Sequence, residues 1–265
     1  MKEIKVQCPA KINLTLKVIN KRDDGFHNIE SIMQKISLYD YLTISLEEAP
    51  KYNIELSGTS QEIPYNEKNL VHKAVTLFIE RTNVPSCYIK IFIDKNIPVS
   101  AGLAGGSTDA AGTLFGLNKL FNEPLSKNEL HELCAKLGSD LNFCLEGGRK
   151  MTKGRGEVIE PMQFEEFNVS LIKPENLGIS AKEAYTKFAM KNDAKKTGRG
   201  NYKNDLEWAV INDYSELQQI KKLYPKAVMS GSGSVYFGVD MEFSPKEGYW
   251  IENNLKAVDT GITVV

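Results

Sequence analysis

The sequence predicts an α+β fold made of two packed units. Its 265 residues exceed the usual size of a single domain, and its 42% apolar and 25% charged residues are typical of a folded globular chain. Residues 3–57 alternate apolar and polar side chains with a period close to two, which predicts antiparallel strands. Helix-like and strand-like patterns mix again after residue 167, which indicates a second α+β layer structure.

The first half of the chain predicts strands followed by helices. The stretches "INLTLKVI", "IESIMQKISL" and "YLTISL" are predicted strands, separated by polar turns such as "KRDDG". A helix is predicted over 69–82, with Asn69 as its cap, because apolar residues recur on one face. The alternating segment 87–97 predicts a strand that leads directly into a glycine-rich loop and then a helix over 108–121.

The helix predicted next, over 126–137, begins with a capping box. Ser126 is followed three residues later by Glu129, and Gly138 is a natural stop. Turns and short strands are predicted over 139–162, and the segment 161–167 is interpreted as a hinge or linker. We therefore predict domains at 1–160 and 161–265. The second half predicts a strand at 168–173, helices at 181–191 and 205–223 around a polar loop, strands at 226–230 and 234–239, a helix at 245–255 and a strand at 260–265.

Composition narrows the possible partners. A net charge of −1 provides no basic field for nucleic acid, so the expected partner is a small molecule. The N-terminus lacks the apolar core of a signal peptide, and no stretch has the roughly 18 apolar residues of a membrane span. Cys8, Cys87, Cys134 and Cys144 form no C-x-x-C pair, so we expect reduced thiols and a cytoplasmic protein.

The glycine-rich segment "PVSAGLAGGSTDAAG", residues 98–112, resembles a phosphate-binding loop. Gly102, Gly105 and Gly106 allow backbone N–H groups to face an anion, and the helix that follows offers its positive N-terminal end. Ser107 and Thr108 are predicted to cap that helix or to donate to phosphate oxygens. A flexible surface turn is the alternative interpretation, but the order of strand, loop and helix favours nucleotide binding.

Several other phosphate and catalytic motifs are absent from the sequence. It contains no G-x-x-x-x-G-K-[ST], no G-x-G-x-x-G, no G-x-S-x-G and no H-E-x-x-H. The positive charge for a phosphate must therefore come from outside the loop.

Two charged residues stand in apolar surroundings. Lys11, in "PAKINL", lies on a strand that should be half buried, where an ammonium needs an anion unless the strand is an edge and the side chain reaches solvent. Asp140, in "GSDLNF", follows a helix stop; its alternative role is a turn aspartate that caps Asn142 or Phe143. Phosphoryl transfer needs a cation and a carboxylate beside the acceptor hydroxyl, and these two residues could supply them.

Three further segments have two interpretations each. Phe26 and His27 follow the turn "DDG" and either contact a flat ligand ring or form a buried hairpin pair. The glycines of "SGSGS" either approach a ligand or make a tight turn. Lys191, Lys195, Lys196, Arg199 and Lys203 either form a solvated surface or lie near a diphosphate substrate.

The motifs together resemble those of the GHMP kinases. The resemblance rests on "PAKINLTL", "DDGFHNIESIMQ", "DKNIPVSAGLAGGSTDAA", "LGSDLNFCLEGG", "GRGE", "GISAKEAY", "NDLE" and "MSGSGSVYFG", which span nearly the whole chain. It implies a two-domain α+β fold, with an N-terminal ATP-loop domain, a ferredoxin-like C-terminal domain and a cleft between them. Within the superfamily the combination of "PAKINL", "GFH" and "GSD" is similar to members that phosphorylate the 2-hydroxyl of a cytidine-diphosphate sugar alcohol on the non-mevalonate route to isoprenoid precursors.

The resemblance also implies roles for individual residues. Asp140 takes the position of the catalytic base and Lys11 that of the residue that orients it. ATP, with Mg²⁺ whose ligands the motifs do not identify, is implied as cofactor. The implied ATP-binding residues are Pro98, Val99, Ser100, Ala101, Gly102, Leu103, Ala104, Gly105, Gly106, Ser107 and Thr108. The implied substrate-binding residues are Asn13, Phe26, His27, Tyr185, Gly231 and Gly233.

The chain departs from that family in a few places. Phe26 stands where many members have tyrosine, Asn142 replaces a frequent proline, "GGRKMTKGRGE" is unusually basic and the tail after residue 255 is short. Three hypotheses remain open from the residues: this kinase, another GHMP kinase of the homoserine or mevalonate type, and a non-catalytic nucleotide or metabolite binder. A monomer or homodimer is expected, with no nucleic-acid or membrane partner.

Overall fold

The structure, a computed structural model, describes residues 2–194 and 203–265. Within these residues the strands form one 11-stranded sheet, in which some strands branch from the main order. The strands are β1 (Lys2–Lys21), β2 (His27–Glu48), β3 (Asn53–Gly58), β4 (Cys87–Asp94), β5 (Arg149–Lys153), β6 (Val158–Pro161), β7 (Asn168–Pro174), β8 (Val228–Met229), β9 (Tyr236–Val239), β10 (Tyr249–Val258) and β11 (Thr263–Val264). The helices are α1 (Leu70–Arg81), α2 (Gly105–Leu120), α3 (Lys127–Leu137), α4 (Leu141–Glu146), α5 (Ala181–Ala194), α6 (Asp205–Val210), the 3₁₀ turn η1 (Ile211–Asp213) and α7 (Ser215–Leu223).

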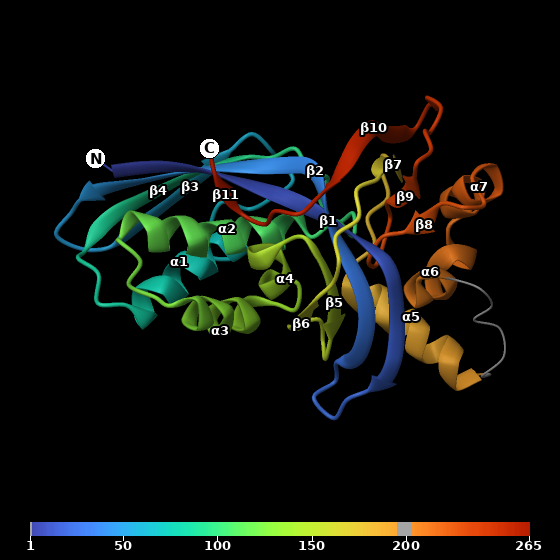
Figure 1. The fold of residues 1–265 in the computed structure, drawn as a ribbon, viewed down its shortest axis with the longest axis horizontal. Coiled ribbons are helices and arrows are strands. Elements are labelled where there is room, and N and C mark those ends of the chain that lie inside the picture. The colour runs from blue at the N-terminus through green and yellow to red at the C-terminus, as the bar shows by residue number, and fades with distance from the viewer. Residues whose placement is uncertain (1, 195–202) are drawn as a thin grey trace.

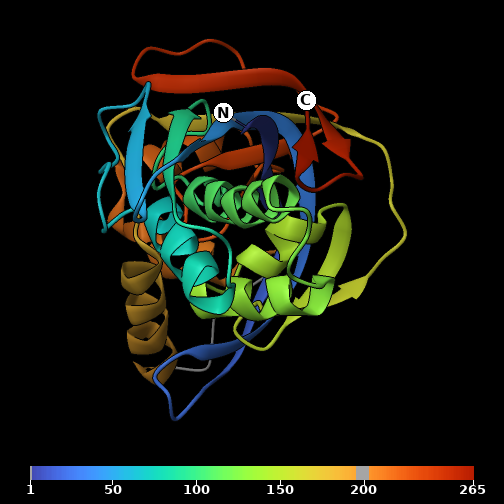
Figure 2. The same ribbon diagram turned by 90° about the vertical axis from the view of Figure 1, so that its left-hand side faces the viewer.

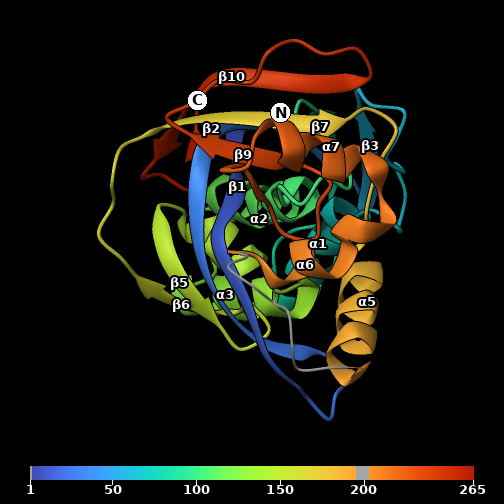
Figure 3. The same cartoon turned by 90° about the vertical axis from the view of Figure 1, so that its right-hand side faces the viewer.

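The long hairpin of β1 and β2 runs through the whole molecule. The two strands pair from Lys2 opposite Leu46 to Lys21 opposite His27, with three register shifts along the way. Such irregularities bend and twist a strand pair. The far ends of the hairpin consequently leave the sheet that α1 and α2 cover and extend beside α5 (Figures 1 and 3).

The N-terminal half is a sheet covered on one face by helices (Figure 2). Buried residues of β1, β2 and β4 pack against α1 and α2, and α3 completes the layer. The side chain of Asn69 accepts the N–H of Val71 at the start of α1, and Ser126 and Glu129 form the capping box of α3. Both predicted helix starts are confirmed.

The C-terminal half places helices against the other end of the hairpin. Leu16, Val18 and Ile29, from β1 and β2, share a buried cluster with residues of α5, α6 and α7. β10 pairs with both β7 and β2, and β11 pairs with β1 (Figure 1). The last strands of the chain thus join its first two strands, while the division into 1–160 and 161–265 stays a prediction.

Three of the predicted elements differ in the structure. Residues 245–255 do not form a helix: Tyr249, Trp250 and Ile251 begin β10 because they pair with β7 and suit a half-buried strand. The helix predicted over 205–223 is broken into α6, η1 and α7, and Tyr214 is extended between η1 and α7. Of the turns and short strands predicted over 139–162, β5 and β6 are confirmed, but the first part of the segment forms the short helix α4.

A third buried cluster lies beneath the glycine-rich loop. It joins Ala101 and Leu103 of the loop to Ile12 of β1 and to Val228 and Val235 near the turn between β8 and β9. The loop therefore rests on a packed apolar base that includes both halves of the chain. The four cysteines are free and buried, as predicted, and no helix in the described ranges is long and apolar enough to cross a membrane.

Candidate functional site

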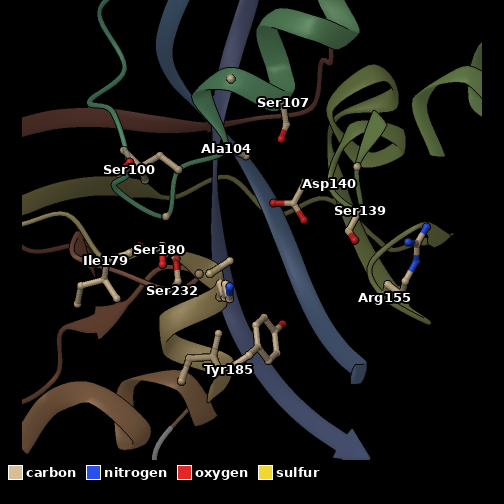
Figure 4. Close-up of a pocket in the computed structure, with 18 of the residues that line it drawn as sticks. Ser100, Ala104, Ser107, Ser139, Asp140, Arg155, Ile179, Ser180, Tyr185 and Ser232 are labelled. Atoms are coloured by element: carbon tan, nitrogen blue, oxygen red, sulfur yellow. Dashed lines mark hydrogen bonds between the residues drawn. The ribbon is translucent and has the colours of Figure 1, made fainter. Parts of the chain in front are cut away.

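A cavity of about 1260 Å³ lies where the two halves meet. Its lining comes from β1, the end of the β1–β2 hairpin, the glycine-rich loop, the start of α4 and the first turns of α5. In Figure 4 the side chains of Ser107, Asp140 and Tyr185 face a common space from α2, the start of α4 and α5. Segments that are far apart in the sequence thus meet around one cavity.

Three residues of the glycine-rich loop have a left-handed backbone conformation. Ser100, Gly102 and Ala104 have φ values of 52°, 78° and 59°. Ala104 is the N-cap residue of α2 and provides no side-chain cap, so the predicted capping by Ser107 or Thr108 is wrong. The N-terminal turn of α2, which begins at Gly105, therefore presents uncapped amides and the positive end of the helix dipole to the cavity.

Gly102 allows a close approach between the loop and the turn after β8. A Cβ at Gly102 would lie 2.0 Å from the carbonyl oxygen of Ser230, and a Cβ at Gly231 would lie 2.9 Å from the Gly102 carbonyl oxygen. The hydroxyl of Ser230 donates to that same Gly102 carbonyl at 2.9 Å. The "SGSGS" turn is therefore a backbone support for the loop.

Lys11 is buried, with only 3% of its surface exposed. β11 pairs with β1 at Val6 and Gln7, away from Lys11, whose backbone N–H donates to the Leu103 carbonyl at 3.1 Å. Because the Lys11 side chain is buried, the alternative of an edge-strand lysine that reaches solvent is wrong. The ammonium donates to Asn13 Oδ1 at 2.6 Å and to the Gly102 carbonyl at 3.0 Å. It also lies 3.5 Å from Asp140 Oδ2.

Asp140 occupies the N-cap position of α4 but makes no capping hydrogen bond with its side chain. The alternative role as a cap for Asn142 or Phe143 is therefore wrong. Its side chain is 28% exposed and lines the cavity. The carboxylate thus faces the cavity, with Lys11 beside it.

Aromatic residues lie at the far end of the cavity from α1. His27 and Tyr185 stack with ring centroids 5.2 Å apart and an angle of 16° between the ring planes. The Phe26 side chain is 50% exposed. Burial, and then the charge of Lys21, lowers the pKa of His27. Burial raises the pKa of Tyr185, and the nearby carboxylate of Asp140 raises it further.

The cavity includes most of the residues that the sequence proposed. Those in its lining are Lys11, Asn13, Phe26, His27, all of 98–107, Asp140, Tyr185 and Gly231. Thr108 and Gly233 are not in the lining: the Thr108 hydroxyl donates to the Pro9 carbonyl, and Gly233 packs on Met229. The amide of Asn13 is occupied by Lys11 and by Ser31, so this side chain supports Lys11.

Sequence reasoning missed a buried charged cluster under the loop. Lys95 forms ion pairs with Asp40 and Asp109, and all three side chains are at most 4% exposed. Burial raises the pKa of Asp109 well above its usual value; the Lys95 ammonium opposes this shift and the Asp40 carboxylate adds to it. Asp109 Oδ1 has no hydrogen-bond partner. The signal in the sequence was a lysine and an aspartate on either side of the glycines.

Arg155 is a second missed residue of the lining. It lies in the turn between β5 and β6, and Gly156 of that turn approaches Ser139 and Asp140. The guanidinium lies 4.8 Å from the centre of the Phe26 ring, and its nearest carboxylate in the described residues, Glu157, is 3.9 Å away. The turn "GRG" belongs to a basic segment of the sequence, but its place beside Phe26 depends on long-range pairing.

The basic loop is described only at its two ends. Lys191 donates to the Trp208 carbonyl at 3.2 Å, and the Lys203 carbonyl accepts the N–H of Leu16 at 2.8 Å. Lys195, Lys196 and Arg199 lie outside the described residues. The proximity of this basic loop to a substrate therefore stays a prediction.

The chain is similar to curated proteins over almost its full length. It is 38% identical over 260 residues to the 4-diphosphocytidyl-2-C-methyl-D-erythritol kinase of Thermoanaerobacter pseudethanolicus, which covers 90% of this chain and 88% of that protein. It is 37% identical over 284 residues to the kinase of the same name from Clostridium perfringens, which covers 98% and 97%. The GHMP kinases N terminal domain family matches residues 69–148.

Solved structures share the fold. A crystal structure of 4-(cytidine 5'-diphospho)-2C-methyl-D-erythritol kinase superposes with a TM-score of 0.72 at 24% identity, over 96% of this chain and 100% of that one. A homoserine kinase from Cytophaga hutchinsonii superposes with a TM-score of 0.69 at 16% identity, over 100% and 98%. The predicted GHMP kinase fold is confirmed, and the sequence identities show that this chain belongs to the 4-diphosphocytidyl-2-C-methyl-D-erythritol kinase family of the GHMP kinases.

Proposed function

We propose that this chain transfers the γ-phosphoryl group of ATP to the 2-hydroxyl of 4-diphosphocytidyl-2-C-methyl-D-erythritol, a step of the non-mevalonate route to isoprenoid precursors. The observation that carries the proposal is the ion pair of Lys11 and Asp140, which lines the same cavity as the uncapped start of α2. A nucleotide binder needs the helix start but not the carboxylate beside a buried ammonium. The pair therefore supports catalysis.

The proposed reaction uses the pair in one displacement. The acceptor oxygen forms a bond to the γ-phosphorus while the bond from that phosphorus to the β–γ bridging oxygen breaks and ADP leaves. The proton of the acceptor hydroxyl goes to the Asp140 carboxylate. Lys11 holds that carboxylate and stabilises the negative charge that develops on the acceptor oxygen.

The phosphates of ATP are assigned to the start of α2. Backbone N–H groups from Gly105 onward and the positive helix end attract them without a lysine in the loop. The apolar side chains of Ile63 and Leu70 line the same cavity on the side of α1, where a flat purine ring would find apolar surface. This arrangement supports ATP as the phosphoryl donor.

The lining also fits a magnesium ion. Mg²⁺ is usually held by one or two carboxylates together with water and substrate phosphates. The Asp109 carboxylate has an oxygen without a hydrogen-bond partner, and Asp109 and Asp40 outnumber Lys95 in that buried cluster. We assign Asp109 and the hydroxyl of Ser107, which also lines the cavity, as the groups that would hold the ion. When bound, Mg²⁺ neutralises phosphate charge.

The acceptor is assigned to the space between Asp140 and the aromatic residues. In the proposed substrate a diphosphate separates the sugar alcohol, which bears the reacting hydroxyl, from cytidine. The cavity repeats this order, because the turn carrying Arg155 approaches Asp140 on one side and Phe26 on the other. We propose that Arg155 contacts the diphosphate and that Phe26, His27 and Tyr185 hold the cytosine ring.

Two alternatives are separated by one assay. Purified protein is incubated with ATP and Mg²⁺ and each of the cytidine-diphosphate substrate, homoserine and mevalonate, and ADP release is measured. We expect ADP with the cytidine substrate alone. Turnover of homoserine or mevalonate instead would assign the chain another GHMP kinase activity. Tight ligand binding without ADP release from any acceptor would favour a non-catalytic binder.

A further inference from the structure

A buried lysine lies directly behind the catalytic pair. Lys35 on β2 has no solvent-exposed surface, and it stands opposite Lys11 in the β1–β2 register. We propose that Lys35 is a positioning residue, whose ammonium fixes β1, α2 and α4 relative to one another beneath the site. The inference rests on the phosphoryl transfer proposed above.

The ammonium first joins β1 to α2. It donates to the Pro9 carbonyl at 2.6 Å and to Thr108 Oγ1 at 3.3 Å, and the Thr108 hydroxyl itself donates to the Pro9 carbonyl at 3.0 Å. Pro9 is two residues before Lys11, and Thr108 follows directly on the uncapped first residues of α2. This triangle therefore links the strand of Lys11 to the helix assigned to the phosphates.

The same side chain also contacts α4. Its ammonium lies 5.5 Å from the centre of the Phe143 ring, which is fully buried three residues after Asp140. The backbone N–H of Lys35 donates to the Gly148 carbonyl at 3.1 Å, just after the helix ends. One residue consequently touches all three elements that carry the proposed catalytic parts.

A lysine at this position has an electrostatic cost. Like charges directly opposite each other on paired strands repel, and burial lowers the pKa of Lys35. The groups that oppose this shift are the thiols of Cys144 and Cys8 and the carboxylate of Asp140. Methionine would fill a similar volume without that cost, so the ammonium needs a reason beyond packing.

The charge of Asp140 supplies part of that reason. The Lys11 ammonium lies 3.5 Å from the Asp140 carboxylate, and that carboxylate is also among the groups that favour the charged form of Lys35. Loss of the Lys35 ammonium would therefore remove a second cation near the proposed base.

The experiment compares three variants with the wild type. Lys35→Met removes the ammonium, Thr108→Val removes one corner of the triangle without a charge change, and the third variant combines them. Lys173→Met is the matched control, because Lys173 is also buried and lies outside the cavity lining. Among the described residues its ammonium donates to two backbone carbonyls, those of Pro174 and Glu175. Steady-state kinetics, urea unfolding and calorimetric binding of a non-hydrolysable ATP analogue are measured for each.

We expect Lys35→Met to lower kcat by about 10- to 100-fold, because small misplacements of reacting groups have effects of that size. The KM for the cytidine substrate should stay within about twofold, because its aromatic and Arg155 contacts are distant from the triangle. The double variant should resemble Lys35→Met, since residues of one network are not additive. Binding of the ATP analogue should weaken in Lys35→Met and not in the control.

Wild-type kinetics in both Lys35→Met and Thr108→Val would overturn the inference, as would equal kcat losses in Lys35→Met and Lys173→Met. If Lys35→Met does not fold, Thr108→Val decides: a lower kcat at wild-type stability supports the triangle, and an unchanged kcat rejects it. Failure of the proposed function is recognised separately, because the wild type would then release no ADP with the cytidine substrate. In that case binding of the ATP analogue decides: weaker binding in Lys35→Met than in Lys173→Met supports the inference, and equal binding in the two variants overturns it.

Discussion

The ammonium of Lys11 lies 3.5 Å from the carboxylate of Asp140, at a point where β1 meets the start of α4. Neither residue is held by the local structure of the other: Lys11 depends on its strand register and Asp140 on the helix that follows it. Their separation therefore depends on the assembly of the whole N-terminal half.

Replacement of the proposed base should remove nearly all turnover but leave nucleotide binding intact. Asp140→Asn keeps the size of the side chain but removes the proton acceptor, and we expect kcat to fall by about 10³-fold. Binding of an ATP analogue, measured by calorimetry, should change less than twofold because α2 is untouched. A kcat within tenfold of the wild type would exclude the role of base.

Asp109→Asn should weaken the response to magnesium. The substitution removes the carboxylate assigned to the ion, so the Mg²⁺ concentration that gives half-maximal activity should rise about tenfold. Titration of MgCl₂ at constant ATP measures this value, and Mn²⁺ binding in the presence of ADP gives a second readout. Asp24→Asn on the exposed hairpin turn is the control. Equal magnesium dependence in both variants would remove Asp109 from the metal site.

Arg155→Met should reduce affinity for the acceptor. Loss of a guanidinium that meets a diphosphate should raise the KM for the cytidine substrate about tenfold while kcat changes little, since Lys11 and Asp140 remain. Arg22→Met, on the hairpin turn and paired with Asp24, is the control and should retain the wild-type KM. A fall in kcat at constant KM would instead mean that Arg155 disturbs Asp140 through Gly156.

Gly102→Ala should be much more destabilising than Gly25→Ala. Both glycines have positive φ, 78° and 85°, but a Cβ at Gly102 would meet the Ser230 carbonyl at 2.0 Å, whereas Gly25 has open space around it. We expect Gly25→Ala to cost about 1 kcal/mol from backbone strain and Gly102→Ala at least about 3 kcal/mol. Urea unfolding measures both; equal losses would show that the loop is free to move away from Ser230.

His27 should make affinity for cytidine ligands depend on pH. Burial lowers its pKa, so the folded protein holds fewer protons than the unfolded chain as pH falls below about 6.5. Its effect on stability is therefore nil above that pH, and stability decreases as pH falls through the lowered pKa. CMP binding should also weaken as pH falls, because the neutral imidazole stacked on Tyr185 is the form proposed to contact the cytosine ring. His27→Asn should remove this part of the dependence, as measured by calorimetry between pH 5 and 8.

Much of the fold was predictable because the sequence marks it locally. Two helix starts are predictable from caps that form within one turn, those of Asn69 and of Ser126 with Glu129. β10 was not predictable in this way, because the segment from Tyr249 pairs with β7, far away in the sequence. The break at Tyr214 likewise depends on how α6 and α7 pack on separate parts of the second core.

The proposed catalytic pair was accessible from sequence because a lysine in an apolar strand and an aspartate after a helix stop are both unusual. Arg155 and Lys35 were not. Arg155 lies in a basic turn, and Lys35 also stands in an apolar strand, but the sequence does not indicate that it lies opposite Lys11. Their importance arises from a turn that returns to Phe26 and from a cross-strand register with Lys11. Only tertiary structure brings such residues to a site.

The support of the glycine-rich loop by the turn at Ser230 and Gly231 has a consequence for how a nucleotide is received. The loop is already pressed against the second half of the chain, through Gly102 and the hydroxyl of Ser230, before any ligand arrives. A nucleotide therefore meets a preorganised site and loses little affinity to the ordering of backbone. Selectivity must then come from the rim of the cavity, where the half-exposed Phe26 ring lies 4.8 Å from the Arg155 guanidinium.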